Sequence, residues 1–278
     1  MTIAVTGVTG RLGSRVARHL SQAGVTQRLI VRDPARAPEL PHTEIARADY
    51  ADHHDAARRA LTGVGTVFMV SASEAPDRVA QHRTFIDAAV AAGVGHLVYT
   101  SFYGAGPAST FTLARDHWAT EEHVRASGLS FTFLRDNLYA DFLPLLVGAD
   151  GVLRGPAGDG RVAAVTLDDV ADAAARVLRT PGQHTGMTYD LTGPRALTLA
   201  EIAALIGAGA GRDVTYRAET VQEAYASRAG LGAPDWQVEA WVSTYTAIAA
   251  GELSGVTDAI PRLIGRPATS VAELLGSP

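Results

Sequence analysis

Short apolar runs alternate with amphipathic helical patterns along the first half of the chain. In the segment 11–23, Leu12, Val16 and Leu20 recur at i, i+4 and i+8, which places them on one face of a helix. The run at 66–70 is almost entirely apolar, as is typical of a strand covered on both faces. The pattern predicts strands at 3–6, 28–31, 44–48, 66–70, 96–100 and 131–135, and helices at 11–23, 52–61, 78–92 and 113–127.

This alternation predicts an α/β fold with a Rossmann-type, doubly wound parallel sheet. It ends after Arg135. We expect a dinucleotide-binding domain over 1–135, with its sheet completed by 161–191, and a smaller, mostly helical substrate-side lobe over 136–278, interleaved with the sheet. The second half predicts a short helix over 137–147, a glycine-rich loop over 151–160, an extended stretch over 161–166, a helix over 168–179, a strand over 188–191, and helices at 199–206, 221–228 and 236–250.

A glycine-rich turn separates the first predicted strand from the first predicted helix. The segment Gly7-Val8-Thr9-Gly10-Arg11-Leu12-Gly13 has the spacing G-x-x-G-x-x-G, not the G-x-G-x-x-G of the standard dinucleotide fingerprint. Glycines here permit a sharp turn, let a pyrophosphate approach backbone N–H groups, and let helix and strand pack closely. The positive end of the helix favours the phosphate. The turn predicts dinucleotide binding, and the alternative is a βα turn without a ligand.

Two further positions bear on the choice of dinucleotide. Arg32 and Asp33 end the second strand, about twenty residues past the glycines. An acid there would bind the ribose hydroxyls of NAD, whereas an arginine suits the 2′-phosphate of NADP. Two solvated loop charges are the alternative. Asp49, after the third strand, is placed to cap the next helix or to reach the adenine amino group. We expect NADP(H), with NAD(H) left open.

Composition narrows the function classes. The net charge of −5 does not favour binding to nucleic acid, which is itself negatively charged. Cysteine is absent, which is compatible with a reducing cytoplasm. No apolar run approaches the ~20 residues of a membrane span, and the N-terminus does not resemble a signal peptide, so we expect a cytoplasmic protein. Lysine is also absent, which excludes a Schiff-base lysine, a P-loop lysine and a Tyr-x-x-x-Lys dyad.

The missing lysine bears on the reaction. Short-chain dehydrogenases that reduce ketones need an acid, usually a tyrosine tuned by a lysine. Quinone reduction demands less, because hydride transfer gives a delocalised anion that water can protonate. Ser101 and Tyr103 follow the strand 96–100, at the sheet edge where ligands bind. His117 could donate a proton or hold a water, and the alternative is a histidine bound to backbone.

Two acidic clusters are interpreted as helix starts. His53 and His54 have acidic neighbours, but adjacent residues on a helix point about 100° apart and do not easily share one ion. We therefore expect no metal site. Asp168 and Asp169 are interpreted as an N-cap pair for the helix that follows them.

Motifs spread over most of the chain together resemble one known family. They are Gly7-Val8-Thr9-Gly10-Arg11-Leu12-Gly13, Val31-Arg32-Asp33-Pro34, Ala48-Asp49-Tyr50, Gln81-His82, Ala92-Gly93-Val94, Tyr99-Thr100-Ser101, His117-Trp118-Ala119-Thr120-Glu121 and Leu263-Ile264-Gly265-Arg266-Pro267. The chain resembles the NmrA-like atypical short-chain dehydrogenases. It is similar to their NAD(P)H:quinone oxidoreductase branch, with triphenylmethane-dye reductases as neighbours.

The resemblance implies a Rossmann domain that holds NADP(H) and a C-terminal lobe that closes over a flat aromatic acceptor. It implies that the pyrophosphate is lined by Gly7, Thr9, Gly10, Arg11 and Leu12. It places Arg32 and Arg36 at the 2′-phosphate, and it places at the nicotinamide side Ser71, Ala72 and Ser73. The family pattern suggests that the acceptor pocket contains Asn137 and Tyr139. Phe102 could stack on the acceptor ring, although aromatic residues more often pack in the core.

The favoured function is NAD(P)H-dependent hydride transfer to a quinone or a similar conjugated aromatic acceptor. One alternative is a non-catalytic NADP(H)-binding, redox-sensing regulator. Another is a biosynthetic reductase of a polyketide or an imine. The expected partner is a small aromatic molecule rather than a nucleic acid or a membrane, and a homodimer is left open.

Overall fold

The computed structural model describes residues 2–51 and 54–276. The chain divides into two compact units, each assembled from three separate stretches. Unit 1 comprises Met1–Ser101, Asp116–Arg135 and Val170–Tyr189. Unit 2 comprises Phe102–Arg115, Asp136–Asp169 and Asp190–Pro278.

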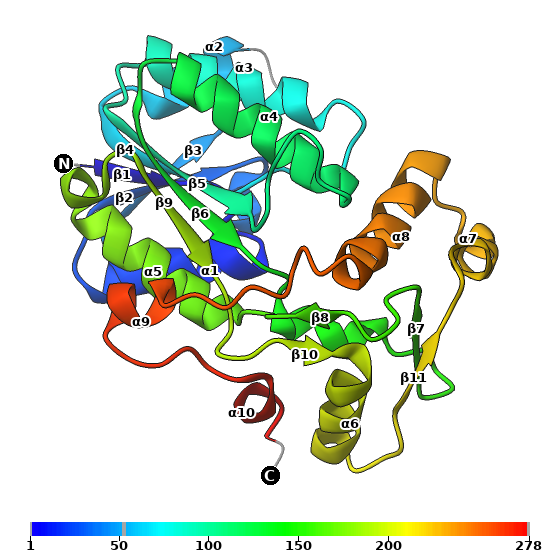
Figure 1. The fold of residues 1–278 in the computed structure, drawn as a ribbon. Coiled ribbons are helices and arrows are strands. Elements are labelled where there is room, and N and C mark those ends of the chain that lie inside the picture. The colour runs from blue at the N-terminus through cyan, green and yellow to red at the C-terminus, as the bar shows by residue number, and fades with distance from the viewer. Residues whose placement is uncertain (1, 52–53, 277–278) are drawn as a thin grey trace. The chain divides into compact units, whose positions relative to one another are not determined.

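A seven-stranded sheet organises unit 1, with the strand order β3-β2-β1-β4-β5-β6-β9 (Figure 1). Its strands are β1 (Thr2–Val5), β2 (Gln27–Val31), β3 (Thr43–Arg47), β4 (Val64–Met69), β5 (His96–Phe102), β6 (Ser130–Asp136) and β9 (Met187–Leu191). The pairs β1–β2, β2–β3, β1–β4 and β4–β5 are parallel. This arrangement confirms the predicted Rossmann-type α/β fold.

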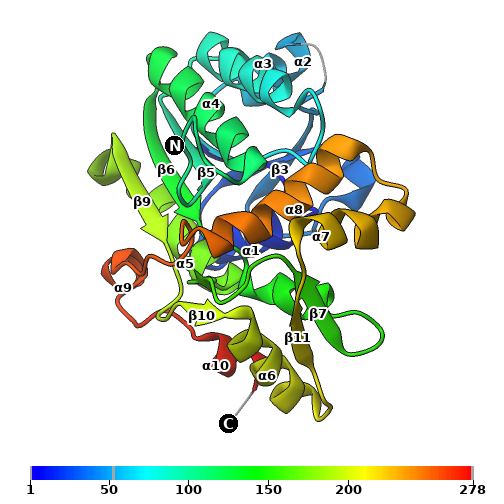
Figure 2. The same cartoon turned by 45° about the vertical axis from the view of Figure 1, so that its right-hand side comes forward.

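Helices cover both faces of this sheet. They are α1 (Arg11–Gln22), α2 (His54–Leu61), α3 (Arg78–Ala91), α4 (Thr112–Ala126) and α5 (Leu167–Arg179), with the 3-10 helices η1 (Pro34–Arg36) and η3 (Pro181–His184) in connections. Helices α2, α3 and α4 lie on one face, and α1 and α5 lie on the other, in both views (Figures 1 and 2). Every residue of β5 is buried because the strand is covered on both sides. Leu12, Val16 and Leu20 form the buried face of α1, as predicted.

The strand order reverses beside β1. The chain runs from β1 outward to β2 and β3, and then crosses to β4 on the other side of β1. In sheets of this kind, ligands bind outside the carboxyl ends of the strands at such a switch point. The fold therefore directs attention to the segments that follow β1, β2, β3 and β4.

Unit 2 combines short strand pairs with helices around its own apolar core. Its elements are η2 (Ala140–Leu146), β7 (Val152–Gly155), β8 (Arg161–Val162), β10 (Leu197–Thr198), α6 (Leu199–Ala210), β11 (Thr215–Ala218), α7 (Val221–Arg228), η4 (Ala229–Leu231), α8 (Asp235–Ala249), α9 (Ala259–Ile264) and α10 (Val271–Leu275). Helices α6, α7 and α8 confirm the three helices predicted after residue 197.

The loop predicted over 151–160 was wrong in its first part, and residues 156–160 form a loop as predicted. The strand β7 (Val152–Gly155) occupies its first part and pairs in parallel with β11 (Thr215–Ala218). Packing, and not a turn, explains why residue 155 is a glycine. A Cβ atom there would lie 2.2 Å from Cδ1 of Tyr245. Glycines were interpreted as a loop signal, whereas here one of them makes room for an aromatic ring.

Two helix starts also needed correction. The helix predicted over 137–147 is the shorter 3-10 helix η2 (Ala140–Leu146). Asn137 stays extended because its N–H donates to the carbonyl of Leu191. Asp168 and Asp169 do not form an N-cap pair, because α5 already begins at Leu167. The Thr166 hydroxyl accepts the Asp169 N–H, and the Asp169 carboxylate is buried in other contacts.

Asp52, where the helix over 52–61 was predicted to start, and its neighbour His53 lie outside the described residues. His54 opens α2. In the part of the chain that the structure describes, no helix has the length and apolar character that a bilayer crossing requires.

Candidate active site

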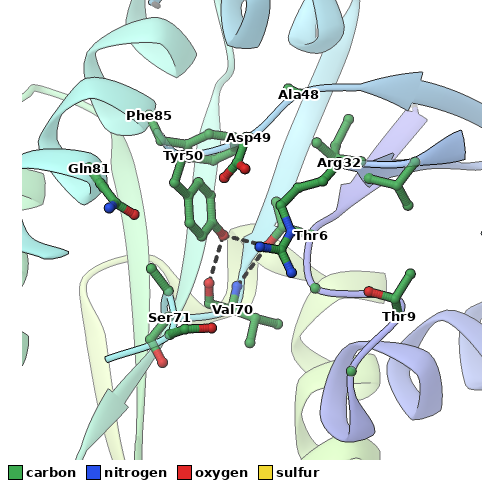
Figure 3. Close-up of a pocket in the computed structure, with 16 residues that line it drawn as sticks. Thr6, Thr9, Arg32, Ala48, Asp49, Tyr50, Val70, Ser71, Gln81 and Phe85 are labelled. Carbon is green, nitrogen blue, oxygen red and sulfur yellow. Dashed lines mark hydrogen bonds between the residues drawn. The ribbon is translucent and has the colours of Figure 1, made fainter. Parts of the chain in front are cut away.

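A pocket in unit 1 lies at the carboxyl ends of four adjacent strands (Figure 3). The segment after β1 contributes Thr6, Gly7, Thr9 and Gly10, β2 contributes Ile30 and Val31, and Arg32 follows β2. The segments after β3 and β4 contribute Ala48, Asp49, Tyr50, Val70, Ser71, Ala72 and Ser73, and α3 contributes Gln81 and Phe85. The pocket is therefore built at the switch point that the strand order indicates.

The glycine turn forms one wall of this pocket. Gly7 has a φ of 64°, a conformation that favours glycine, and a Cβ atom there would lie 3.0 Å from Cβ of Val70. At Gly13 a Cβ atom would lie 2.4 Å from the carbonyl oxygen of Gly7, so this glycine lets α1 pack against the turn. Gly7 thus permits the sharp turn, and Gly13 permits the close packing of the helix, as expected for such a motif.

The N-terminus of α1 suits an anionic group. Gly10 is the N-cap residue, and the first turn contains no acidic residue. The first N–H groups of an α-helix have no partner inside the helix, and the helix dipole adds partial positive charge. Thr9 and Gly10 line the pocket at this end. Arg11 and Leu12 are not among the lining residues, since Arg11 is exposed and the Leu12 side chain is buried under the helix.

Arg32 and Asp33 are oriented differently. Arg32 lines the pocket, and its side chain extends over it in Figure 3. The Asp33 carboxylate accepts the N–H of Ala35 at 3.0 Å and caps η1. Arg36 lies in η1, is exposed, and is not among the lining residues. Asp49 lines the pocket, and its carboxylate accepts the N–H of Ala51 at 3.3 Å.

Tyr50 and Thr6 connect three strands beneath the pocket. The two hydroxyl oxygens lie 2.6 Å apart, and the Tyr50 hydroxyl donates to the carbonyl of Val70 at 2.6 Å (Figure 3). The N–H of Val70 donates to the Thr6 hydroxyl at 2.9 Å. Burial raises the pKa of the Tyr50 phenol above its ordinary value, so the ring is neutral. No role was predicted for either residue, although Tyr50 follows Asp49 at the strand end that singled out Asp49.

The three catalytic candidates do not line this pocket. Ser101 is buried, and its hydroxyl donates to Glu121 Oε1 at 2.6 Å. The buried His117 ring has Nδ1 2.9 Å from the Tyr99 hydroxyl and Nε2 3.1 Å from Nη2 of Arg78. Burial, and then the Arg78 charge, hold the pKa of His117 well below its ordinary value. His117 is therefore neutral, and an arginine donor requires that Nε2 accept.

Tyr103 and the acceptor candidates belong to unit 2. The Tyr103 ring packs against Gly255, where a side chain would collide with the hydroxyl, and burial followed by the Asp190 charge raises its pKa. Phe102 is buried against Phe111, with ring centroids 4.8 Å apart. This packing corresponds to the core alternative named for Phe102.

Asn137 and Tyr139 are held at the end of β6. The Asn137 amide donates to the carbonyl of Leu253 at 3.0 Å, and the Tyr139 hydroxyl donates to the Asp136 carboxylate at 2.6 Å. Burial raises the pKa of Asp136 to about 8, although the Tyr139 hydrogen bond opposes this shift. No role was predicted for Asp136, because it follows the strand predicted over 131–135 and an acidic residue at a strand end gives no local sign of its burial.

A metal site requires a cluster of histidine, cysteine or acidic side chains. Among the residues that the structure describes, no group of three or more such side chains could hold a metal ion.

Comparison with known proteins identifies the family. The model of the NmrA-like family matches residues 1–239. An NAD(P)H azoreductase of Xenophilus azovorans is 35% identical over 98% of this chain and 96% of its own length. The solved structure of an NADPH-dependent quinone oxidoreductase from Escherichia coli in complex with NADPH is 36% identical, with a TM-score of 0.89 over 99% of this chain and 98% of that one.

A triphenylmethane reductase from Citrobacter sp., solved with NADP(H), is 32% identical. Its TM-score is 0.88, and the match covers 99% of each chain. The motifs quoted from the sequence, the sheet order and these matches agree. The chain belongs to the NmrA-like family.

Proposed function

We propose that this chain is an NAD(P)H-dependent reductase that transfers a hydride to a quinone or a similar conjugated aromatic acceptor. The observation that carries the proposal is the convergence in one pocket of the glycine turn, the acid-free N-terminus of α1 and Arg32. The three features have the chemistry that pyrophosphate and a second phosphate need. The relatives whose names specify NADPH, NADP(H) or NAD(P)H support the same cofactor class.

The described residues fit a dinucleotide along the strand ends. Gly7, Thr9 and Gly10 would hold the pyrophosphate at α1, with Arg11 and Leu12 contributing backbone N–H groups. Asp49 follows β3, which is separated from β4 by β2 and β1, and it would face the adenine half. Ser71, Ala72 and Ser73 after β4 would line the nicotinamide side. When bound, the reduced nicotinamide supplies a hydride, and the protein supplies binding and orientation.

We propose that NADPH is preferred over NADH. Arg32 offers a planar donor pair to a 2′-phosphate, and Arg36 lies one helical turn beyond it. Asp33 would oppose a phosphate only if its carboxylate entered the pocket. Its hydrogen bond to the N–H of Ala35 holds that carboxylate at the start of η1.

The proposed acceptor class rests on chemistry and on the relatives. Reductases of quinones, azo compounds and triphenylmethane dyes all act on conjugated aromatic molecules, and each is at least 32% identical to this chain. A chain without lysine cannot form the Tyr-Lys pair of ketone-reducing relatives. We propose Ser101, Tyr103 and His117 as the polar candidates for the reaction. We propose Phe102, Asn137 and Tyr139 as acceptor contacts, of which Asn137 and Tyr139 belong to the lobe over 136–278. A cytoplasmic location and a homodimer are part of the same proposal.

The test begins with binding. Calorimetric titration of the purified chain with NADPH should give a single saturable site, and absence of binding would exclude the cofactor assignment. The bound protein is then mixed with a benzoquinone, a naphthoquinone and a simple ketone, and NADPH absorbance is followed. We expect NADPH consumption with the quinones and none with the ketone. Binding without consumption for any acceptor would favour the regulator.

A further inference from the structure

Three consecutive backbone N–H groups beyond β4 are bound by side chains rather than by a neighbouring strand. The N–H of Val70 donates to the Thr6 hydroxyl at 2.9 Å, and the N–H of Ser71 donates to the Thr100 hydroxyl at 2.9 Å. The N–H of Ala72 donates to Nε2 of His82 at 2.8 Å. Because β4 ends at Met69, these donors have left the sheet ladder, and each would be costly if buried without a partner.

Side chains of one helix bind both the backbone N–H and the backbone carbonyl of Ala72. Its N–H is bound by His82, and its carbonyl accepts a hydrogen bond from Nε of Arg78 at 3.0 Å. Both side chains come from the first turns of α3 and are buried, with 0% and 5% of their surface exposed. Helix α3 therefore fixes the position of a peptide that lines the pocket.

The protonation of His82 is specified by its neighbours. The Thr120 hydroxyl donates to the carbonyl of Asp116 at 2.8 Å, so its oxygen must accept from Nδ1 of His82, which lies 2.8 Å away. The other ring nitrogen is then a lone-pair acceptor for Ala72. Burial, and then the Arg78 charge, lower the pKa of His82 to about 3, so the ring stays neutral at ordinary pH.

Arg78 connects this loop to the rest of unit 1. Its Nη2 lies 3.1 Å from Nε2 of His117, and its Nη1 lies 3.7 Å from Asp116 Oδ2. A buried guanidinium engaged on several sides has little freedom to move. The carbonyl of Ala72 is thus bound to a donor whose own position is constrained.

We propose that His82 and Arg78 are positioning residues for the cofactor, because their clamp on Ala72 holds the nicotinamide-side wall of the pocket in place. This inference rests on the proposed function. The clamp acts on the segment 71–73, which lies beyond β4, whereas Arg32 and Asp49 lie beyond β2 and β3. Its loss should therefore affect one half of a bound dinucleotide and spare the other.

The experiment compares two ligands on one variant. His82→Leu removes the acceptor for the Ala72 N–H. We expect the affinity for NADPH to fall roughly 5- to 100-fold, because the free variant can relax to hydrate the Ala72 N–H and binding must then bury that donor without a partner. Adenosine 2′,5′-bisphosphate lacks the nicotinamide half, so its affinity should not change. Hydrogen exchange at the Ala72 amide, measured without ligand, should accelerate in the variant.

The matched control is His96→Leu. His96 is also a buried histidine, with Nε2 2.9 Å from a threonine hydroxyl, that of Thr132, but it lies at the opposite, amino end of β5. We expect this variant to lose stability while binding both ligands as the wild type does. His82→Gln should restore much of the NADPH affinity, because its side-chain carbonyl can accept from Ala72.

Equal weakening of both ligands by His82→Leu, or no weakening of either, would overturn the inference. Failure of His82→Gln to recover any affinity would also count against the hydrogen bond. Failure of the wild-type chain to bind NADPH is a separate outcome, and it would overturn the proposed function itself.

Discussion

Arg32 and Asp33 are sequence neighbours of opposite charge, and the backbone separates their roles. Pro34 starts η1, and the Asp33 carboxylate accepts the N–H of Ala35 as its cap. Asp33 therefore has a local partner, while Arg32 extends over the pocket. Discrimination between the two dinucleotides is then expected to rest mainly on the guanidinium of Arg32, because Arg36 does not line the pocket.

Arg32→Ala tests that expectation. A charge-assisted hydrogen bond is worth roughly 1.5–3 kcal/mol, or about ten- to a hundredfold in affinity. The ratio of kcat/KM for NADPH over that for NADH should fall by this factor, chiefly through loss of NADPH activity. The NADH rate serves as the internal control, since NADH has no 2′-phosphate. A wild-type ratio near one, or a ratio that the substitution does not change, would mean that Arg32 does not bind the phosphate.

A second prediction at this scale concerns the buried carboxyl of Asp136. Its pKa is raised by burial to about 8 in the folded chain, against about 4 for an unfolded aspartate. The folded state thus binds the proton more tightly, and the stability that this provides is complete below about pH 4 and is lost as the pH rises to about 8. Asp136→Asn should remove this loss, since an amide cannot ionise and can still accept the Tyr139 hydroxyl.

The measurement is the difference between the unfolding free energies of wild type and Asp136→Asn across this pH range. Subtraction cancels the other titrating groups. We expect the variant to gain relative stability steadily as the pH rises. A difference that is independent of pH would show that the carboxyl has an ordinary pKa in the folded chain.

At the scale of elements, different glycines in the turn between β1 and α1 are expected to serve ligand binding and helix packing. A Cβ atom at Gly10 would lie 3.2 Å from the carbonyl oxygen of Gly7, a distance that a small shift relieves. At Gly13 the same atom would lie 2.4 Å away, against backbone that cannot shift so far. The glycines of one motif thus serve different purposes.

Gly10→Val should therefore abolish NADPH binding while the folded structure is retained. The branched side chain would enter the space at the N-terminus of α1 that we assign to the pyrophosphate. Gly13→Val should instead lower the unfolding free energy by roughly 1–3 kcal/mol or more, because it overpacks the helix–strand contact. Calorimetric titration and thermal unfolding of both variants distinguish the two effects. Unchanged NADPH affinity in Gly10→Val would contradict the assigned pyrophosphate site.

At the scale of the whole molecule, each unit is assembled from three separate stretches of the chain, so contacts distant in sequence hold it together. Within unit 2, the carboxylate of Asp169 at the start of α5 is fully buried and binds the segment after α9. It pairs with Arg266 at 2.6 Å and accepts the N–H of Thr269 at 2.6 Å. The Gly265-Arg266-Pro267 motif therefore ties residues about a hundred positions apart into one unit.

Arg266→Ala should destabilise the protein, because it leaves a buried carboxylate without its cation. We expect a loss of roughly 1–3 kcal/mol in the unfolding free energy, measured by chemical denaturation. Arg262→Ala is the matched control. Arg262 lies four residues earlier and pairs with Asp258 at 3.6 Å on the surface, so its removal should cost less than ~0.5 kcal/mol. Equal losses of unfolding free energy in the two variants would show that the buried Asp169–Arg266 pair stabilises the protein no more than a surface pair does.

The local pattern of apolar and polar residues was sufficient to predict the seven strands of the unit 1 sheet and the helices that cover it. Its strands are short apolar runs, and its helices have a buried face at regular spacing, so both signals are contained in neighbouring residues. The glycine turn, Arg32 and Asp49 were predicted from the residues, and the segment 71–73 was predicted from the family resemblance. They meet in one pocket because parallel strands end at the same sheet edge.

Contacts between residues distant in sequence decided the features that the local pattern did not predict. β7 and β11 are strands because they pair with each other across some sixty residues, and Tyr245 requires the glycine that had suggested a loop. Thr6 and Tyr50, His82 and Ala72, and Asp136 and Tyr139 acquire their roles from partners or from burial that the sequence pattern does not reveal. The sequence by itself determined the elements of unit 1 and the glycine turn, since these depend on local conformation and periodicity. Only the tertiary structure decided which polar side chains are buried and to what they are bound, because hydrogen bonds and burial depend on residues distant in sequence.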